Sequence, residues 1–246
     1  MSNYSDQIDS HVLEQIDEGM QIQIKRFHEA TAKGILRIGW KIGVTTAAAQ
    51  KKFRLSSPVI GSLDGTRTYS TESKVSLRKD AKIRAEAEIS LRINRDMDGQ
   101  ASVDEARAAI ETVGPAIEFI DLNMPSDDIS VILGHSIFHN AVIFGEESDP
   151  DVLARQASLW PIGRRNTKCV RTPEPAMIPH DLPALLVLVA GTLGRYGECL
   201  KEGDRIISGS YIVPLIVECG DVIEVDYGEL GKVSAITVND GNAYMS

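Results

Sequence analysis

The sequence is poor in aromatic residues and in cysteine. Phe, Trp and Tyr make up 5% of the 246 residues, and the three cysteines are Cys169, Cys199 and Cys219. An odd number of cysteines without a CxxC spacing argues against both a disulfide framework and a zinc knuckle. We therefore expect an aliphatic core and a reducing compartment, the cytoplasm.

Basic residues and long apolar runs are also scarce. The chain has 26 Lys and Arg against 35 Asp and Glu, which gives a net charge of −9. Nucleic acids and anionic membranes need a basic surface, so neither is an expected partner. No apolar run reaches the roughly 20 residues of a membrane-spanning helix. The polar, acidic N-terminus is not typical of a secretory signal.

Hydrophobic periodicity and turn residues predict an α+β protein with a β-rich C-terminal half. We find no internal repeat, low-complexity block or clear linker. Helices are expected at residues 12–34, 45–54, 102–113, 127–137 and 181–203, and strands at 35–44, 82–93, 115–123 and 139–145. Ser102 and Glu105 form a capping-box pattern at the start of one of these helices. Residues 56–71 are expected to be a loop, and 148–180 loop and edge strand.

Two carboxylates stand two residues apart in the predicted strand "KIRAEAEISLRI". Side chains at i and i+2 of a strand point to the same face, about 7 Å apart, so Glu86 and Glu88 share a face. On a helix they would diverge by roughly 200°. One interpretation places both on a solvent-exposed face, paired with nearby Arg and Lys side chains.

A third carboxylate favours the other interpretation, a metal site. Glu118 lies in the apolar run "PAIEFIDLN", where a buried carboxylate should be paired or bound to a metal. Three carboxylates are hard oxygen ligands, which suit Mg²⁺, Mn²⁺ or Ca²⁺ better than zinc. Spacing alone leaves both interpretations open.

Several motifs, taken in chain order, resemble one known family. "GWKIGVT" is followed by "SPVIGSLDG", "KIRAEAEISLRI" and "PAIEFIDLN", and later by "GDRIISGS" with a trailing "CGD" and "GELGK". This succession resembles the fumarylacetoacetate hydrolase superfamily, and within it the 2-keto-4-pentenoate hydratase and 4-oxalocrotonate decarboxylase branch. The resemblance covers roughly residues 19–238.

The resemblance implies a mixed β-roll core with flanking helices. We expect an N-terminal helical segment, residues 1–34, and a β-roll catalytic domain, residues 35–246, as one structural unit. By their match to the family motifs, Glu86, Glu88 and Glu118 are the expected ligands of a divalent metal, Mg²⁺ or Mn²⁺, with Ca²⁺ also suitable. Lys41 matches the family's active-site lysine. Ser208, Gly209 and Ser210 match a turn that lines the substrate pocket.

The activity that the resemblance implies is that of a metal-dependent lyase. The expected substrate is a 2-hydroxydienoate or unsaturated 2-oxo acid, and the first expectation is a hydratase that forms a 4-hydroxy-2-oxo acid. A 4-oxalocrotonate-type decarboxylase, an acylpyruvate-type C–C hydrolase or an oxaloacetate tautomerase are alternatives. A non-catalytic partner subunit is the alternative from another class. A homo-oligomer, a complex with a related pathway enzyme and a role in aromatic compound catabolism are also implied.

Four departures from the family pattern limit these expectations. No histidine lies between His28 and His135, whereas hydrolytic members carry a His–acid pair there, so hydrolysis is disfavoured. Asp64 is a candidate proton-shuttling acid, although it stands earlier than the family's acid and is also a typical turn residue. His135 and His139 replace polar pocket residues; at i and i+4 of a helix they would share a face and could form a proton relay or bind the far end of a substrate. The alternative is that both are ordinary hydrogen-bonded histidines beside a strand. The segment before Glu18 is shorter than the family's, which leaves oligomer contacts open.

Overall fold

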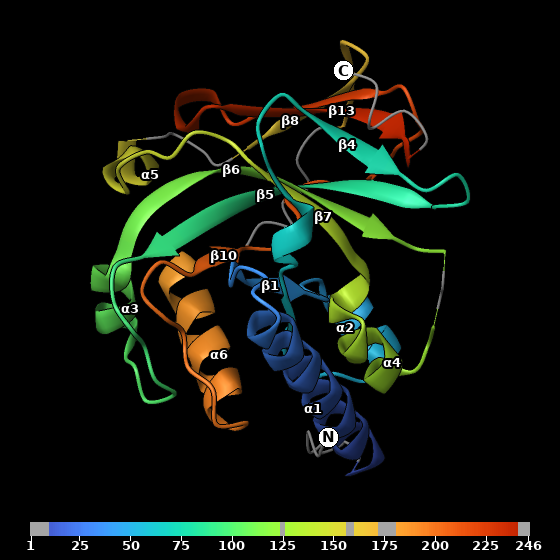
Figure 1. The fold of residues 1–246 in the computed structure, drawn as a ribbon. Coiled ribbons are helices and arrows are strands. Elements are labelled where there is room, and N and C mark those ends of the chain that lie inside the picture. Colours follow the sequence, from blue (N-terminus) through green and yellow to red (C-terminus); the bar gives the residue numbers. More distant parts are fainter. Residues whose placement is uncertain (1–9, 124–125, 156–159, 172–180, 241–246) are drawn as a thin grey trace, which may run out of the picture.

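The computed structural model describes residues 10–123, 126–155, 160–171 and 181–240 (Figure 1). The helices are α1 (Ser10–Ala32), α2 (Ala47–Phe53), α3 (Val103–Ala109), α4 (Ile129–Gly134), α5 (Asp151–Arg155) and α6 (Leu182–Gly194). The strands are β1 (Gly39–Gly43), β2 (Val59–Ser62), β3 (Thr68–Ser70), β4 (Ser73–Leu77), β5 (Ile83–Ile93), β6 (Ile110–Asp121), β7 (His139–Phe144), β8 (Ile162–Arg165), β9 (Lys168–Arg171), β10 (Arg205–Ile207), β11 (Leu215–Ile216), β12 (Val222–Asp226) and β13 (Lys232–Asn239).

Two mixed sheets form the β part of the molecule. The larger has eight strands in the order β2-β1-β10-β5-β6-β7-β3, with β11 also paired to β5, and the smaller has the order β4-β13-β12-β8-β9. Helices α1, α2, α4 and α6 lie on one side of the large curled sheet, and the five-stranded sheet lies on the other (Figure 1). The predicted α+β class with a mixed, curled sheet and flanking helices is confirmed. Within the described residues, no helix is both long and apolar enough to cross a membrane.

The core is aliphatic and centres on β5 and β6, the two longest strands. Ala85, Ala87, Ile89 and Leu91 of β5 are all at most 1% exposed, which is the alternation expected of a strand with one face in the core. On the helical side, α1 crosses α4 closely at Gly19, where a Cβ would lie 2.7 Å from the Ser130 carbonyl oxygen. The N-terminal helix α1 thus packs onto the rest of the described structure. The division of the chain into two parts at residue 34 stays a prediction. Residues 1–9 and 241–246 lie outside the described part of the chain.

Capping side chains start four of the described α-helices, and two of them stand at the residues that the sequence indicates. The Ser102–Glu105 capping box is present in full, and Asp181 accepts a hydrogen bond from the Ala184 amide at the start of α6. The helix expected to reach residue 113 ends at Ala109 instead. Residues 110–113 join β6 because they pair with β5 and bury Val113, a gain of apolar burial that outweighs local helix propensity.

Two further expectations were wrong. Residues 56–71 contain β2 and β3 rather than a loop, because Val59 and Ile60 are buried where β2 pairs with β1. The expected helix 127–137 ends at Gly134, and a left-handed turn, η2 (Ser136–Phe138), follows it. His135 and His139 therefore do not share a helix face. Within 148–180 the structure has α5, β8 and β9, while 156–159 and 172–180 lie outside the described residues.

Candidate active site

Three glutamates converge at the centre of the large sheet. In the antiparallel pairing of β5 with β6, Glu86 lies directly opposite Glu118, and Glu88 follows two residues along on the same face. One carboxylate oxygen from each lies within 4.8 Å of the others. Glu88 and Glu118 are completely buried and Glu86 is half-buried, so the set does not lie on a solvent-exposed face.

The two buried glutamates each have one oxygen that is hydrogen-bonded and one that is not. Glu88 Oε2 accepts a hydrogen bond from the Gly209 amide at 2.8 Å. Glu118 Oε1 lies 2.5 Å from Lys41 Nζ and 2.7 Å from His139 Nδ1. Glu88 Oε1 and Glu118 Oε2 are buried without a hydrogen-bond partner in the described structure. A buried anionic oxygen without a partner is costly, and a cation would remove that cost.

The pKa shifts of the three glutamates also indicate that this cluster needs a nearby positive charge. Burial raises the pKa of Glu86 to about 7, and the neighbouring Glu118 carboxylate adds to the rise. Burial and the two other carboxylates hold the pKa of Glu88 well above its usual range. Burial would also raise the pKa of Glu118, but Lys41 and His139 outweigh it and the pKa is lowered. Three hard carboxylates, two of which have a buried oxygen without a hydrogen-bond partner among the described residues, fit a divalent ion such as Mg²⁺, Mn²⁺ or Ca²⁺.

A cavity of about 210 Å³ opens beside these glutamates. The polar groups at it include Lys41, Glu86 and Ser210, together with the backbone of Gly209. Its remaining lining is mostly small or apolar and consists of Ile42, Gly43, Val44, Thr45, Thr46, Ala49, Ile120, Ile137 and Phe138. The cavity can therefore hold a small molecule with one charged end and one apolar end.

The turn that matches the family's substrate-pocket motif contributes two residues to this cavity. Gly209 has a φ of +87°, and a Cβ there would lie 2.6 Å from Thr45 Cγ2, so the position requires glycine. Ser210 lines the cavity and donates from Oγ to the Ile212 carbonyl oxygen at 2.7 Å. Ser208 is completely buried, and its Oγ accepts a hydrogen bond from the Ile89 amide, which attaches the turn to β5.

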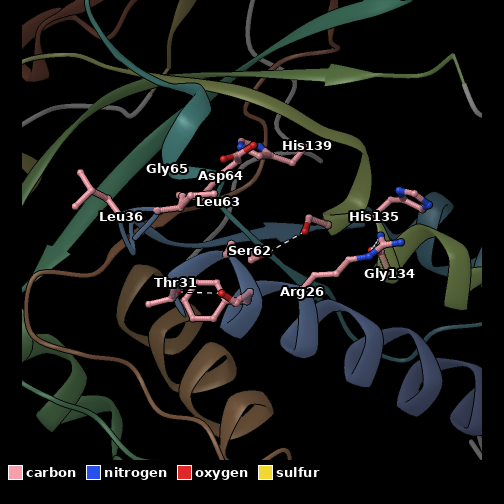
Figure 2. A pocket seen from close by; sticks show the side chains of 14 residues that line it. Arg26, Thr31, Leu36, Ser62, Leu63, Asp64, Gly65, Gly134, His135 and His139 are labelled. Carbon is pink, nitrogen blue, oxygen red and sulfur yellow. Dashed lines mark hydrogen bonds between the residues drawn. The ribbon is translucent and has the colours of Figure 1, made fainter. Parts of the chain in front are cut away.

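The other three predicted residues line a second cavity, of about 240 Å³, between α1 and the turn that precedes β7 (Figure 2). Asp64 is exposed and caps a short helical turn, with Oδ1 accepting from the Thr66 amide at 2.8 Å. His135 is exposed, whereas the His139 side chain is 2% exposed and contacts Glu118. The structure does not bring Asp64 or His135 to the cavity that contains Lys41. Their proposed roles stay predictions.

Sequence reasoning missed two features of the site. Lys41 Nζ donates to the Ile137 carbonyl oxygen at 3.2 Å, and Ile137 has a φ of +54°, which no sequence pattern indicates for a β-branched residue. His139 reaches Glu118 because the pairing of β6 with β7 shifts register between Phe119 and Ile120. A register shift of this kind leaves no signal in a single sequence.

Comparisons with known proteins agree with the fold and the motifs. No family model matches the chain. A 2-hydroxyhexa-2,4-dienoate hydratase of Comamonas testosteroni is 28% identical over 235 residues, covering 92% of this chain and 88% of the relative. A 4-oxalocrotonate decarboxylase of Pseudomonas putida is 28% identical over 222 residues, covering 88% of this chain and 82% of the relative.

Among solved structures, a 4-oxalocrotonate decarboxylase of Pseudomonas putida G7, complexed with magnesium and adipate, has the same fold. Its TM-score is 0.81 at 24% sequence identity, with 89% of this chain and 85% of that chain covered. The resemblance inferred from the sequence motifs is confirmed, and so is the fold class that it implies.

Proposed function

We propose that this chain, a relative of the hydratases and decarboxylases of the fumarylacetoacetate hydrolase superfamily, is a divalent-metal-dependent lyase. Its substrate is a 2-hydroxydienoate or unsaturated 2-oxo acid, and its reaction is the addition of water to give a 4-hydroxy-2-oxo acid. One observation carries the proposal: two buried carboxylate oxygens, Glu88 Oε1 and Glu118 Oε2, have no partner in the described structure, next to a cavity that contains Lys41.

Glu86, Glu88 and Glu118 would hold the metal, Mg²⁺ or Mn²⁺, with Ca²⁺ also suited to the same oxygen ligands. When bound, the ion supplies a Lewis acid that polarises oxygen atoms of a 2-oxo acid. Magnesium in the decarboxylase of similar fold supports this assignment. The half-buried Glu86 lies at the cavity, so the ligand set is accessible from the space that a substrate would fill.

Lys41 is held in place by two acceptors on different elements. Its Nζ donates to Glu118 Oε1 on β6 and to the carbonyl oxygen of Ile137, while the side chain lines the cavity. A fixed ammonium group in a buried site stabilises negative charge that develops on a bound substrate, because it needs no reorganisation. Lys41 would therefore bind the substrate carboxylate or the enolate oxygen.

The lining of the cavity favours a substrate with a single carboxylate. Among the described residues at this cavity, Lys41 is the only cationic side chain, and Val44, Ala49, Ile120 and Phe138 supply apolar surface. A dicarboxylate would place its second charge on that apolar surface without a partner, which is unfavourable. This favours the hydratase reaction over loss of CO₂ from a diacid.

A 4-oxalocrotonate-type decarboxylase is the second candidate, because the chain is 28% identical both to a hydratase and to such a decarboxylase. The same site can serve either reaction, since both need negative charge to be stabilised on the 2-oxo acid. A C–C hydrolase has less support, because no histidine lies between His28 and His135. We also infer from the resemblance a cytoplasmic homo-oligomer that acts in aromatic compound catabolism and has a related pathway enzyme as its partner.

A turnover assay with Mg²⁺ or Mn²⁺ tests the proposal. The substrates are 2-hydroxypenta-2,4-dienoate and 2-oxohex-3-enedioate, with the conjugated ultraviolet band and CO₂ release followed in parallel. We expect loss of the band on the dienoate without CO₂, abolished by a chelator. CO₂ release from the diacid would establish the decarboxylase instead. No turnover on either substrate, with no metal bound, would overturn the lyase and favour a non-catalytic partner subunit.

A further inference from the structure

His139 is in direct contact with one of the proposed metal ligands. It is the first residue of β7, its side chain is 2% exposed, and its Nδ1 lies 2.7 Å from Glu118 Oε1. Because an ionised carboxylate oxygen can only accept, Nδ1 must carry the proton in this contact. Lys41 Nζ donates to the same oxygen. With two donors on Oε1, the other oxygen of Glu118 is left for a further ligand.

Glu88 is held in the same manner by a different donor. The Gly209 amide occupies Glu88 Oε2, and Oε1 is left without a partner in the part of the chain that the structure describes. Each of the two completely buried glutamates therefore has one oxygen that accepts hydrogen bonds from the protein and one oxygen without a partner among the described residues. Hydrogen bonds of this kind to ligand side chains orient them toward the metal and raise its affinity.

The backbone before His139 is in an unfavourable conformation that the surroundings maintain. Ser136, Ile137 and Phe138 have φ values of 50°, 54° and 61°, in the left-handed region that non-glycine residues avoid. Residues in this region are conformationally unfavourable and persist where neighbouring contacts fix them. Here the Ile137 carbonyl accepts from Lys41, and Ser136 Oγ lies 2.8 Å from Ser62 Oγ. The turn thus delivers both the Ile137 carbonyl and the His139 ring to the Lys41–Glu118 pair.

We propose that His139 is a positioning residue of the metal site: its Nδ1–H holds Glu118 Oε1 and keeps Oε2 available to the ion. This inference rests on the proposed metal-dependent function and assigns His139 a role other than substrate binding. Its Nε2 is buried without a hydrogen-bond partner in the described structure, and its side chain is almost inaccessible. A ring buried to this degree can orient Glu118 but offers little surface to a substrate.

Mn²⁺ affinity, measured by isothermal titration calorimetry on the metal-free full-length protein, tests the inference. We expect His139→Ala and His139→Gln to weaken Mn²⁺ binding about 10- to 100-fold. Gln preserves volume but cannot place a donor near the Nδ1 position, whereas the amide nitrogen of His139→Asn can. We therefore expect His139→Asn to stay within about fivefold of the wild type, by the same orienting argument. His28→Ala is the matched control, because it removes another histidine–glutamate contact, with Glu198, away from this site.

The variants separate the possible results. Equal Mn²⁺ affinity of the wild type and His139→Gln would overturn the inference. Equal weakening in His139→Asn and His139→Gln would also overturn it, because a donor at Nδ1 would then not be the cause. A purely structural role would lower the thermal midpoint in chelator and leave the dissociation constant unchanged. Failure of the proposed function itself is recognised separately, because the wild type would then bind no Mn²⁺.

Discussion

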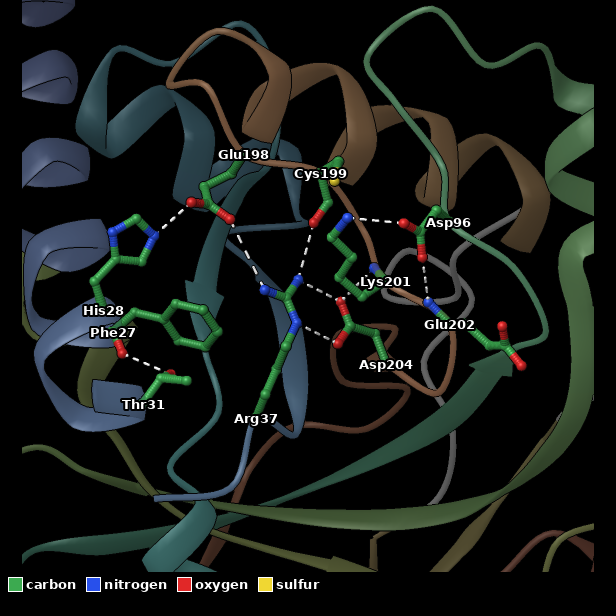
Figure 3. A network of polar contacts seen from close by, with 10 residues as sticks. All are labelled: Phe27, His28, Thr31, Arg37, Asp96, Glu198, Cys199, Lys201, Glu202 and Asp204. Atoms are coloured by element: carbon green, nitrogen blue, oxygen red, sulfur yellow. Dashed lines mark hydrogen bonds and ion pairs between the residues drawn. The ribbon is translucent and has the colours of Figure 1, made fainter. Parts of the chain in front are cut away.

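Two clusters of charged residues join distant segments of this chain, and they differ in charge balance. The Arg37 network consists of Arg37, Asp204, Glu198, His28, Lys201 and Asp96 (Figure 3). In it, Arg37 Nε and one terminal nitrogen each lie 2.6 Å from an oxygen of Asp204. The glutamate cluster of the candidate site has three carboxylates against a single lysine and the His139 ring.

The difference distinguishes a structural network from a functional one. Asp204 is 2% exposed, yet both of its oxygens accept hydrogen bonds from Arg37, and one also accepts from the Lys201 amide. Its burial is thus compensated. Glu88 is equally buried, but one of its oxygens has no hydrogen-bond partner in the part of the chain that the structure describes, and its pKa is raised. Asp204 is thus satisfied by the protein itself, whereas two oxygens of the glutamate cluster have no hydrogen-bond partner among the described residues, as expected of a ligand-binding site.

The strongest test of this comparison is Glu88→Gln, which removes one negative charge and changes the shape little. We expect turnover to fall at least about 1,000-fold, because a ligand of the metal that polarises the substrate is lost. In chelator, however, the thermal midpoint should rise, because the substitution removes the cost of burying this carboxyl group beside two other carboxylates. Calorimetric melting and turnover of the same preparation measure both effects. A lower midpoint in chelator would contradict the interpretation of Glu88 as an uncompensated charge.

The same change of carboxylate to amide in the Arg37 network should have the opposite effect on stability. Asp204→Asn removes the negative charge and one of the two acceptor oxygens that face Arg37, and breaking a buried pair of this type costs about 3 kcal/mol. We expect a lower free energy of unfolding in urea and Mn²⁺ affinity equal to that of the wild type. A loss of metal affinity without loss of stability would show that the two clusters are not independent.

The smallest expected effect is a pH dependence of stability in the metal-free protein. The pKa of Glu86 is raised to about 7 from its ordinary value of 4.5, so the folded state favours the protonated form. The stability that this group contributes is complete below about pH 4.5 and is lost as the pH rises to about 7. We expect the thermal midpoint in chelator to decrease over this range by a few degrees relative to Glu86→Gln, and saturating Mg²⁺ to abolish the difference. An identical pH profile for both proteins in chelator would contradict the raised pKa.

Local sequence determined much of the fold. The alternation in "KIRAEAEISLRI", the apolar run around Glu118 and the Ser102 capping box predicted β5, the interior strand β6 and the start of α3, and the structure confirms these elements. They were predictable because strand alternation and capping depend on residues close together in the chain. The end of α3 and the strands β2 and β3 could not be predicted in this way, because they depend on pairing with strands that are distant in the chain.

For the candidate site, the sequence by itself determined which side chains are present and that Glu86 and Glu88 share a strand face. Only the tertiary structure decided that Glu118 lies opposite Glu86, that His139 contacts Glu118, and that Asp64 lines a different cavity from Lys41. The register of β6 against its neighbours and the left-handed turn before β7 set these distances. Such geometry arises from packing between segments far apart in the chain, and for that reason a local pattern does not encode it.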